Sequence, residues 1–517
     1  MNDEGAKLPG SAPTSSRRHT VVLSDVHLSQ AHPHDPDDPL WMLYRTRAFH
    51  PDEDFAALVD HLLRTYGADP IELVFNGDIL DFDAPWVKDG GSSFDEFPLT
   101  DQGCAEQVRR IMADHDPWFR AVARLLNAGH RVLFTSGNHD VELFWPGVRR
   151  TIREELRCLC ALEAGEGTAR AASEPIEERV RFRAWFHVTE DRIYLEHGSQ
   201  YDVFNGVRHA MLPVTLDRDH IHPMFGKLAF KRTGSRMGYF NPYYEETFYM
   251  GFFGYIGHFF SHYALSGRNI VRPWCLGGLR TVLDIWRHRH RDDRVEEGHR
   301  LAHEETGASR AAIDATHALR ARPAEETMLP ILRELWLDRV GLAFLIVLVA
   351  GVATLLAGWS VGAITLGALV VLFVLYELLT PKPDIRTYDS APLTVLELFD
   401  IHDVRAICMG HTHRPFARWD DRGRVYANSG SWCPAFIDPH CTKPVLDRRP
   451  LLFFTTEGDA LRGGLYWWKD GELIADVDAD AGVHADVHAD ADAHADADAH
   501  ADAGAGGVTG AAAQAEE

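Results

Sequence analysis

Five short segments of the chain carry side chains that can bind metal ions, and each follows an apolar run. They read "SDVHLS", "NGDILDF", "SGNHDVE", "LEHGSQ" and "MGHTHRP". Carboxylate, imidazole and amide donors together suit Mn, Fe or Zn, whereas Ca and Mg prefer shells made of oxygen alone. The segments therefore predict a site for such a metal, and their candidate ligands are Asp25, His27, Asp78, Asn138 with His139 and Asp140, His197, His411 and His413.

Asp78 has the properties of a ligand that two ions share. Two divalent cations about 3.5–4 Å apart form a hydrolytic site, and they need one ligand that offers both oxygens or a shared oxygen. A carboxylate fixed at the end of a strand meets this need. Taken singly, an Asp or His in such a place is more often a turn or cap residue. Five such segments in one chain make a metal site the stronger interpretation.

The elements that must position these residues follow an alternation of strands and helices. Apolar runs rich in β-branched residues occur in "HTVVLSD", "IELVFNGD", "HRVLFTSGN" and "VRAICMGH", and each is followed by polar residues or Gly. Between the first three lie "FAALVDHLLRTYG" and "PWFRAVARLLNAG", whose apolar residues recur at three- and four-residue spacing before a Gly. This pattern predicts an α/β fold of βαβ units, in which functional side chains collect at the carboxyl ends of the strands.

The motifs, in this order, resemble those of the calcineurin-like metallophosphoesterase superfamily. The resemblance rests on "SDVHLS", "GDILDF", "GNHD", a lone "HG" and "GHTH", and "YANSGSW" is similar to the strand and turn that follow the last motif. It covers residues 20–203 and 384–456. Five motifs in the right order are a specific signal. The resemblance implies a four-layer α/β/β/α sandwich and a metal-dependent phosphoester hydrolase.

The same resemblance implies a role for each candidate residue. One ion would be held by Asp25, His27, Asp78 and His413, and the other by Asp78, Asn138, His197 and His411. Two divalent cations are expected, with Mn favoured over Fe and Zn. His139 would contact the phosphate or protonate the leaving oxygen, Asp140 would orient His139, and Asp81 would support the site from behind the ligands.

Within the superfamily, the motif style is similar to that of UDP-2,3-diacylglucosamine hydrolases, which cleave a pyrophosphate in a lipid precursor. In those enzymes the lone His is typically followed by Gly-Asp, whereas Gly198 and Ser199 follow His197 here. The segment inserted after this motif is also longer than their helical cap. We therefore expect a phosphorylated substrate, plausibly a lipid-linked phosphate or pyrophosphate, with a soluble phosphorylated molecule as the alternative.

Residues 340–379 form a run with hardly any charge. About 20 apolar residues cross a bilayer, so two transmembrane spans are expected, about 340–357 and 361–379, joined near "AGWS". Candidate ligands lie on both sides of this run and must meet at one site, which requires an even number of crossings. Basic residues flank the outer ends, which places the catalytic domain on the cytoplasmic face of the cell membrane. The alternative is a helical pair buried in a soluble core.

The remaining sequence completes a six-part organisation. The expected parts are a disordered leader 1–18, a first catalytic part 19–204, a helical insert 205–330, the hairpin region 331–382, a second catalytic part 383–474 and a disordered Ala/Asp/His-rich tail 475–517. The insert is aromatic and basic, and we expect either a surface or acyl-chain groove at a membrane or the core of a soluble cap. The formal net charge of −24 does not indicate nucleic acid as a partner.

These features predict a membrane-anchored di-metal phosphoester hydrolase that works by metal-activated hydroxide attack on phosphorus. One alternative keeps the metals and the anchor but makes the substrate soluble. Another is a non-catalytic membrane module whose metal site only stabilises a binding surface. A purely structural metal site has no use for a neighbouring proton donor, so His139 speaks against this last alternative.

Overall fold

The computed structural model describes most of the chain between the expected leader and the tail. The described residues are 17–33, 43–88, 90–93, 99–164, 174–222, 224–236, 252–264, 271–288, 294–380, 393–438 and 440–476. The expected tail lies outside the described residues from 477 onward, and so does the leader up to residue 16.

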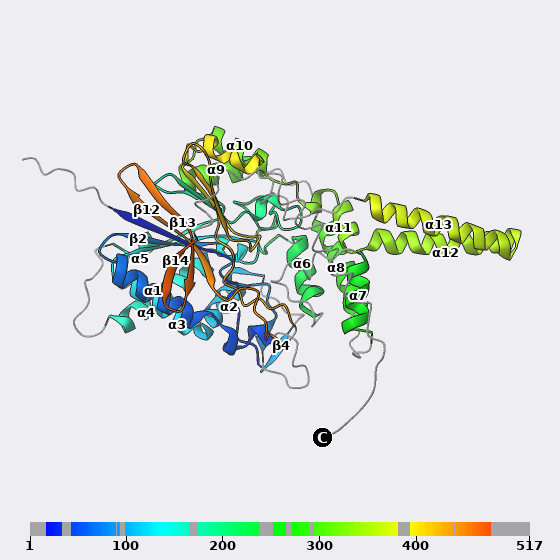
Figure 1. Cartoon of the computed structure of the whole chain (residues 1–517), viewed down its shortest axis with the longest axis horizontal. Coiled ribbons are helices and arrows are strands. Elements are labelled where there is room, and N and C mark those ends of the chain that lie inside the picture. The colour runs from blue at the N-terminus through cyan, green and yellow to red at the C-terminus, as the bar shows by residue number, and fades with distance from the viewer. Residues whose placement is uncertain are drawn as a thin grey trace, which may run out of the picture.

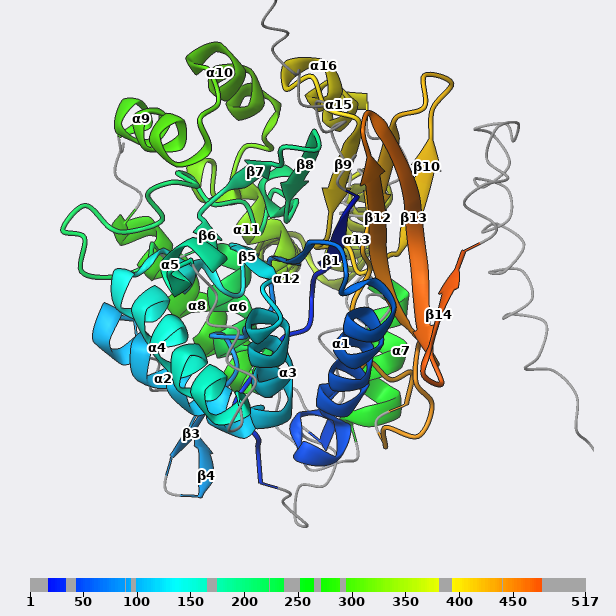
Figure 2. The same ribbon diagram turned by 90° about the vertical axis from the view of Figure 1, so that its left-hand side faces the viewer.

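Two β-sheets form the centre of the molecule (Figure 2). The larger sheet has seven strands in the order β14-β13-β12-β1-β2-β5-β6. Their bounds are β1 Arg18–Leu23, β2 Ile71–Asn76, β5 Arg131–Thr135, β6 Val180–Arg183, β12 Arg449–Glu457, β13 Ala460–Lys469 and β14 Glu472–Ala475. Strands β1, β2, β5 and β6 are parallel, and β12 joins β1 in the antiparallel direction.

The smaller sheet has five strands in the order β10-β11-β9-β8-β7. Their bounds are β7 Phe186–Val188, β8 Ile193–Glu196, β9 Ala406–Met409, β10 Phe416–Trp419 and β11 Val425–Asn428. The two sheets pack face to face, since Val22, Val74 and Leu133 of the larger sheet share one core with Leu195 and Cys408 of the smaller. All five are fully buried, which explains the apolar runs without alternation in the sequence.

Helices cover the outer face of each sheet. Four of them lie on the larger sheet: α1 Asp52–Tyr66, α2 Asp101–Asp114, α3 Asp116–Asn127 and α4 Pro146–Glu163 (Figure 2). Their apolar faces meet the sheet through side chains such as Phe55 and Trp118, whose rings stack at 3.6 Å between centroids. The predicted α/β/β/α architecture is confirmed.

The second outer layer comes largely from the segment that the sequence assigned to the insert. Helices α9 Val295–Thr306 and α10 Arg310–Leu319, with the short α15 Leu393–Leu396 and α16 Leu398–Ile401, cover the smaller sheet. Ala302 and Ile313 are buried in the same cluster as Tyr194 and Ile407 of that sheet. Part of the insert therefore completes the sandwich.

The other insert helices lie between the sandwich and the apolar hairpin (Figure 1). They are α6 Phe225–Arg232, α7 Phe252–His262, α8 Val271–His288 and α11 Leu329–Glu334. Phe225, Ile285, Ile331 and Leu335 are buried together, so α6, α8 and α11 share one small core. Most of the aromatic run before Phe252 lies outside the described residues.

Helices α12 Leu337–Ala357 and α13 Trp359–Leu379 form a hairpin that projects from the body of the molecule (Figure 1). Gly358 makes the turn with a φ of 87°, a conformation that suits glycine. Only 11% and 6% of the most apolar windows of the two helices are buried, and both helices are long and apolar enough to cross a membrane. The alternative of a helical pair buried in a soluble core is therefore wrong.

Candidate metal centre

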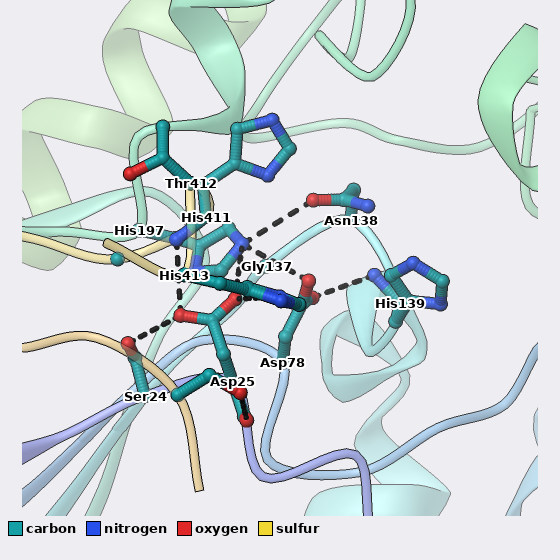
Figure 3. A network of polar contacts seen from close by, with 12 residues as sticks. Ser24, Asp25, Asp78, Gly137, Asn138, His139, His197, His411, Thr412 and His413 are labelled. Carbon is teal, nitrogen blue, oxygen red and sulfur yellow. Dashed lines mark hydrogen bonds and ion pairs between the residues drawn. The ribbon is translucent and has the colours of Figure 1, made fainter. Parts of the chain in front are cut away.

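The candidate ligands lie on loops that leave the carboxyl ends of five strands. Asp25 and His27 follow β1, Asp78 follows β2, Asn138 follows β5, His197 follows β8, and His411 and His413 follow β9. Because these strands end at the same edge of the two packed sheets, the seven side chains come together. Figure 3 shows six of them, and His27 lies with Asp25 and His413.

One group of donors comes from β1 and β9. The Nε2 atom of His413 lies 3.2 Å from Oδ1 of Asp25 and 3.4 Å from Nε2 of His27. The donor atoms of these three residues all lie within 4.8 Å of one another. A cation at this point would have a carboxylate oxygen and two imidazole nitrogens as ligands, which is a donor set suited to Mn, Fe or Zn.

The second group of donors surrounds His197. Its Nδ1 atom lies 3.0 Å from the carbonyl oxygen of Asn76, so Nδ1 carries a proton and donates to that oxygen. Its Nε2 atom lies 3.1 Å from Oδ2 of Asp78 and 3.2 Å from Oδ1 of Asn138. The lone pairs of these three atoms therefore point toward one another, and a proton or a cation between them would relieve the repulsion. His411 also reaches this group, within 4.8 Å of the Asp78 and His197 donor atoms.

Negative charge dominates the electrostatics of the site. Burial raises the pKa of Asp78, but His197 and His139 outweigh this effect and hold the pKa well below its usual range. Burial lowers the pKa of His197, but Asp78 and Asp25 outweigh it and raise the pKa to about 10. Both carboxylates are fully buried and ionised beside these rings. The residues present thus fit a pair of divalent cations.

The ligand backbone adopts a conformation that L-residues rarely take. Positive φ angles occur at Asp25 (54°), His27 (53°), Asp78 (53°), His411 (71°) and His413 (59°). A non-glycine residue in the left-handed region costs about 1–2 kcal/mol. Strain at five candidate ligands from three separate loops is typical of a functional site rather than of ordinary turns.

Three motif glycines allow the loops to approach one another closely. A Cβ atom at Gly77 would overlap the imidazole of His197, and one at Gly137 would lie 2.6 Å from the backbone nitrogen of Asp78. At Gly410 a Cβ atom would lie 2.6 Å from Oδ2 of Asp25. These contacts explain why glycine precedes the ligands in "GD", "GNHD" and "GHTH".

His139 lies beside the candidate ligands, and its imidazole comes within 4.8 Å of donor atoms of His27 and Asp78. Its ring meets the ring of His27 edge-on, with 4.8 Å between centroids. Its Nδ1 atom lies 3.5 Å from Oδ1 of Asp81 and 3.3 Å from Oδ2 of Asp83. Burial lowers the pKa of His139, but Asp78, Asp81 and Asp83 outweigh it and raise the pKa to about 9. With Nδ1 facing two carboxylates, Nε2 is the ring nitrogen that can meet a substrate.

The carboxylate of Asp140 accepts hydrogen bonds from the backbone of two neighbouring loops. Its Oδ2 accepts hydrogen bonds from the backbone nitrogens of Ile79 (2.9 Å) and Leu80 (3.3 Å), and Oδ1 accepts one from Gly137 (2.6 Å). It therefore ties together the two loops that carry Asp78 and Asn138. The carboxylates that face the His139 ring are those of Asp81 and Asp83, and the orienting role expected of Asp140 stays a prediction.

Two further residues at the site carry no recognisable motif. Oδ2 of Asp202 lies 3.1 Å from Nε2 of His411, so this carboxylate orients a candidate ligand. Arg45 is buried and forms an ion pair with Asp81 at 2.8 Å. Asp202 lies five residues after His197, in the loop where the sequence departs from the usual Gly-Asp pair.

Comparison with known proteins gives one family match. Residues 18–233 match the family model described as calcineurin-like phosphoesterase. A comparison with curated proteins found no match. Among solved structures, that of vacuolar protein sorting 29 from Cryptosporidium parvum is similar at 17% sequence identity, over 16% of this chain and 42% of that chain, with a TM-score of 0.13. The chain thus spans less than half the length of that protein.

Proposed function

We propose that this chain hydrolyses a phosphoester or pyrophosphate bond, because residues 18–233 form a calcineurin-like phosphoesterase domain. Members of that family are metal-dependent phosphoester hydrolases. The observation that carries the proposal is the convergence of seven metal-binding side chains from both sheets at one edge, next to His139. A site that only stabilised the fold would not need an imidazole held by Asp81 and Asp83 beside the ligands.

The residues divide into two ligand sets and a proton donor. Asp25, His27, Asp78 and His413 would hold one divalent cation, and Asp78, Asn138, His197 and His411 would hold the other. When bound, the cations polarise the phosphoryl oxygens and lower the pKa of water. His139 donates the proton on Nε2 to the leaving oxygen. Mn is the favoured metal, because the nitrogen and oxygen donors suit it.

The proposed location is the cell membrane, with α12 and α13 as the anchor and the catalytic domain on the cytoplasmic face. The exposed apolar surface of the hairpin supports this proposal. A second support is α8, which lies beside the base of the hairpin and runs across its direction (Figure 1). On the side of α8 away from the core, large apolar side chains are 39–63% exposed: Leu276, Leu279, Leu283 and Trp286. Such a stripe suits the surface of a bilayer.

A lipid-linked phosphate or pyrophosphate is the proposed substrate. The apolar hairpin and the apolar stripe of α8 lie on one side of the molecule. If both contact the bilayer, the enzyme meets a lipid-linked substrate whose acyl chains lie in that bilayer. The motif similarity to UDP-2,3-diacylglucosamine hydrolases points to the same class of substrate. A soluble substrate would need no apolar stripe on α8.

The test uses the full chain in detergent micelles with Mn²⁺. We expect hydrolysis of bis(4-nitrophenyl) phosphate, and loss of about 100-fold or more in Asp78→Asn. The matched control is His220→Asn, since His220 is exposed and outside the site. Equal turnover in Asp78→Asn and the control would refute the hydrolase.

The substrate class is tested by comparing one pyrophosphate head group with and without acyl chains. The double variant Leu279→Glu and Leu283→Glu should lower kcat/KM only for the acylated form, because charge on α8 opposes contact with lipid. Carbonate washing of cell membranes should leave the wild-type chain in the pellet. An equal preference for the two substrates would support the soluble-substrate alternative.

A further inference from the structure

Two lysines of α6 are buried against carboxylates behind the metal centre. Lys227 and Lys231 are only 6% and 3% exposed. The Nζ atom of Lys227 lies 2.7 Å from Oδ1 of Asp83 and 2.9 Å from Oε1 of Glu142. The Nζ atom of Lys231 lies 3.2 Å from the same oxygen of Asp83. Both carboxylates are fully buried.

Stability alone does not explain this arrangement. Removing a charged group from water costs several kcal/mol, and apolar residues of similar size often stabilise a core at least as well as a buried ion pair. Lys227 and Lys231 are four residues apart, so one face of α6 presents both ammonium groups to Asp83. Burial lowers the pKa of Lys227, but Asp83 and Glu142 outweigh it, so the ammonium stays charged.

Asp83 connects these lysines to His139. One of its oxygens, Oδ1, faces the lysines, and the other, Oδ2, lies 3.3 Å from Nδ1 of His139. The same helix also touches the imidazole directly, because the ring of Phe230 meets it edge-on with 5.7 Å between centroids. Helix α6 therefore reaches His139 by an ionic route and by a packing route.

We propose that Lys227 and Lys231 are positioning residues, which fix the carboxylate of Asp83 and through it the ring of His139. This inference rests on the proposed function, since it requires His139 to be the proton donor. In that step the oxygen of water bonds to phosphorus and its proton passes to the solvent, while the bond from phosphorus to the leaving oxygen breaks. The leaving oxygen takes the proton on Nε2 of His139, and the solvent then returns a proton to the imidazole. The insert helix α6 is then part of the catalytic machinery.

The test uses two aryl phosphodiesters that differ in their need for a proton. 4-Nitrophenolate leaves readily without protonation, whereas phenolate leaves poorly. For the Lys227→Met variant we expect kcat to fall about 10–100-fold with diphenyl phosphate and less than about 3-fold with bis(4-nitrophenyl) phosphate. His139→Ala should show the same selectivity. Bound metal, measured on the same samples, should not change.

Arg232→Met is the matched control. Arg232 lies on the same helix, but its guanidinium pairs with Asp284 of α8 at 2.5 Å, away from His139. This variant should slow both substrates equally or neither. If Lys227→Met also slows the hydrolysis of both substrates equally, or has no effect, the lysines are structural and the positioning role is wrong. In that case an active wild type and an inactive Asp78→Asn would still support the proposed hydrolase function.

Two further measurements keep the inference testable. If Lys227→Met folds poorly, Lys227→Arg keeps the charge and should recover most of the lost turnover with diphenyl phosphate. Histidine ¹⁵N NMR of the wild type and Lys227→Met reports the proton on Nδ1 of His139 without any need for activity. A hydrogen-bonded Nδ1 proton that is unchanged in Lys227→Met would overturn the proposal even if no substrate were hydrolysed.

Discussion

Gly137 offers a perturbation that acts on Asp78 through packing alone. A Cβ atom at this position would lie 2.6 Å from the backbone nitrogen of Asp78 and 2.8 Å from its Cγ. Gly137 does not have a positive φ, so alanine meets no conformational penalty there. Whatever Gly137→Ala does must therefore come from displacement of the loop that carries Asp78.

The expected size of the effect follows from the overlap. Real Cβ contacts are longer than 3.0 Å, and the atoms in the way are backbone and a ligand carboxylate, which cannot rotate aside. Overpacking of this kind costs about 1–3 kcal/mol of stability. A shift of a catalytic group by about 1 Å lowers turnover by about 100-fold. We expect both effects, with the loss of activity exceeding the loss of folded protein.

The assay combines three measurements on Gly137→Ala. Urea unfolding gives the change in stability, metal analysis gives the number of ions retained, and hydrolysis of bis(4-nitrophenyl) phosphate gives kcat. The control is Gly298→Ala, because a Cβ atom there meets no other atom within 4 Å. Gly298 lies in α9, where alanine should add about 0.5–1 kcal/mol of stability.

The reasoning would be refuted by a Gly137→Ala variant that keeps full turnover and both ions. Such a result would mean that the loop accepts a methyl group without moving Asp78. Loss of stability without loss of activity would mean that the added methyl group disturbs the fold but does not move the side chain of Asp78.

Two other predictions concern stability. Burial raises the pKa of Glu325 from 4.5 to about 7, so between these pH values the folded chain keeps a proton that the unfolded chain loses. As the pH rises through this range, the free energy of unfolding of the wild type should fall by up to about 3 kcal/mol relative to Glu325→Gln, as measured by urea unfolding. A parallel slope for both proteins would contradict this. The buried pair of Arg45 and Asp81 should cost about 3–5 kcal/mol when either Arg45→Met or Asp81→Asn breaks it, and the double variant should cost clearly less than the sum. Additive losses would show that the two groups do not interact.

The strand ends and the convergence of the candidate ligands could be predicted because the signal is local. A buried parallel strand reads as an unbroken apolar run, and the residue that follows it in these loops is Asp, Asn or His beside a Gly. Parallel strands bring such residues to one edge whatever their distance along the chain. For the same reason α12 and α13 could be located from composition, to within a few residues of their ends.

The residues around His139 could not be predicted, because their signal is not local. Lys227 is 144 positions from Asp83 in the chain, and a lysine in an amphipathic helix normally faces water. Asp140 follows His139 directly, which suggests a contact between the two side chains. Three backbone N–H groups in adjoining loops needed an acceptor, however, and the Asp140 carboxylate satisfies them.

The sequence also did not show which helices of the insert belong to the sandwich. Helices α9 and α10 have the apolar periodicity of any surface helix, and nothing in that periodicity tells which sheet such a helix covers. Only the contact of Ala302 and Ile313 with the smaller sheet shows that they belong to the sandwich.

The order of the ligands along the chain has a consequence for biosynthesis. A ribosome makes α12 and α13 before it makes His411 and His413, and before β12, which pairs with β1. A growing chain therefore exposes its most apolar segment while the hydrolytic centre still lacks two imidazoles and the larger sheet lacks three strands. Activity can begin only after the hairpin has left the ribosome, so a truncated product that ends before His411 has the apolar hairpin but lacks two of the candidate ligands.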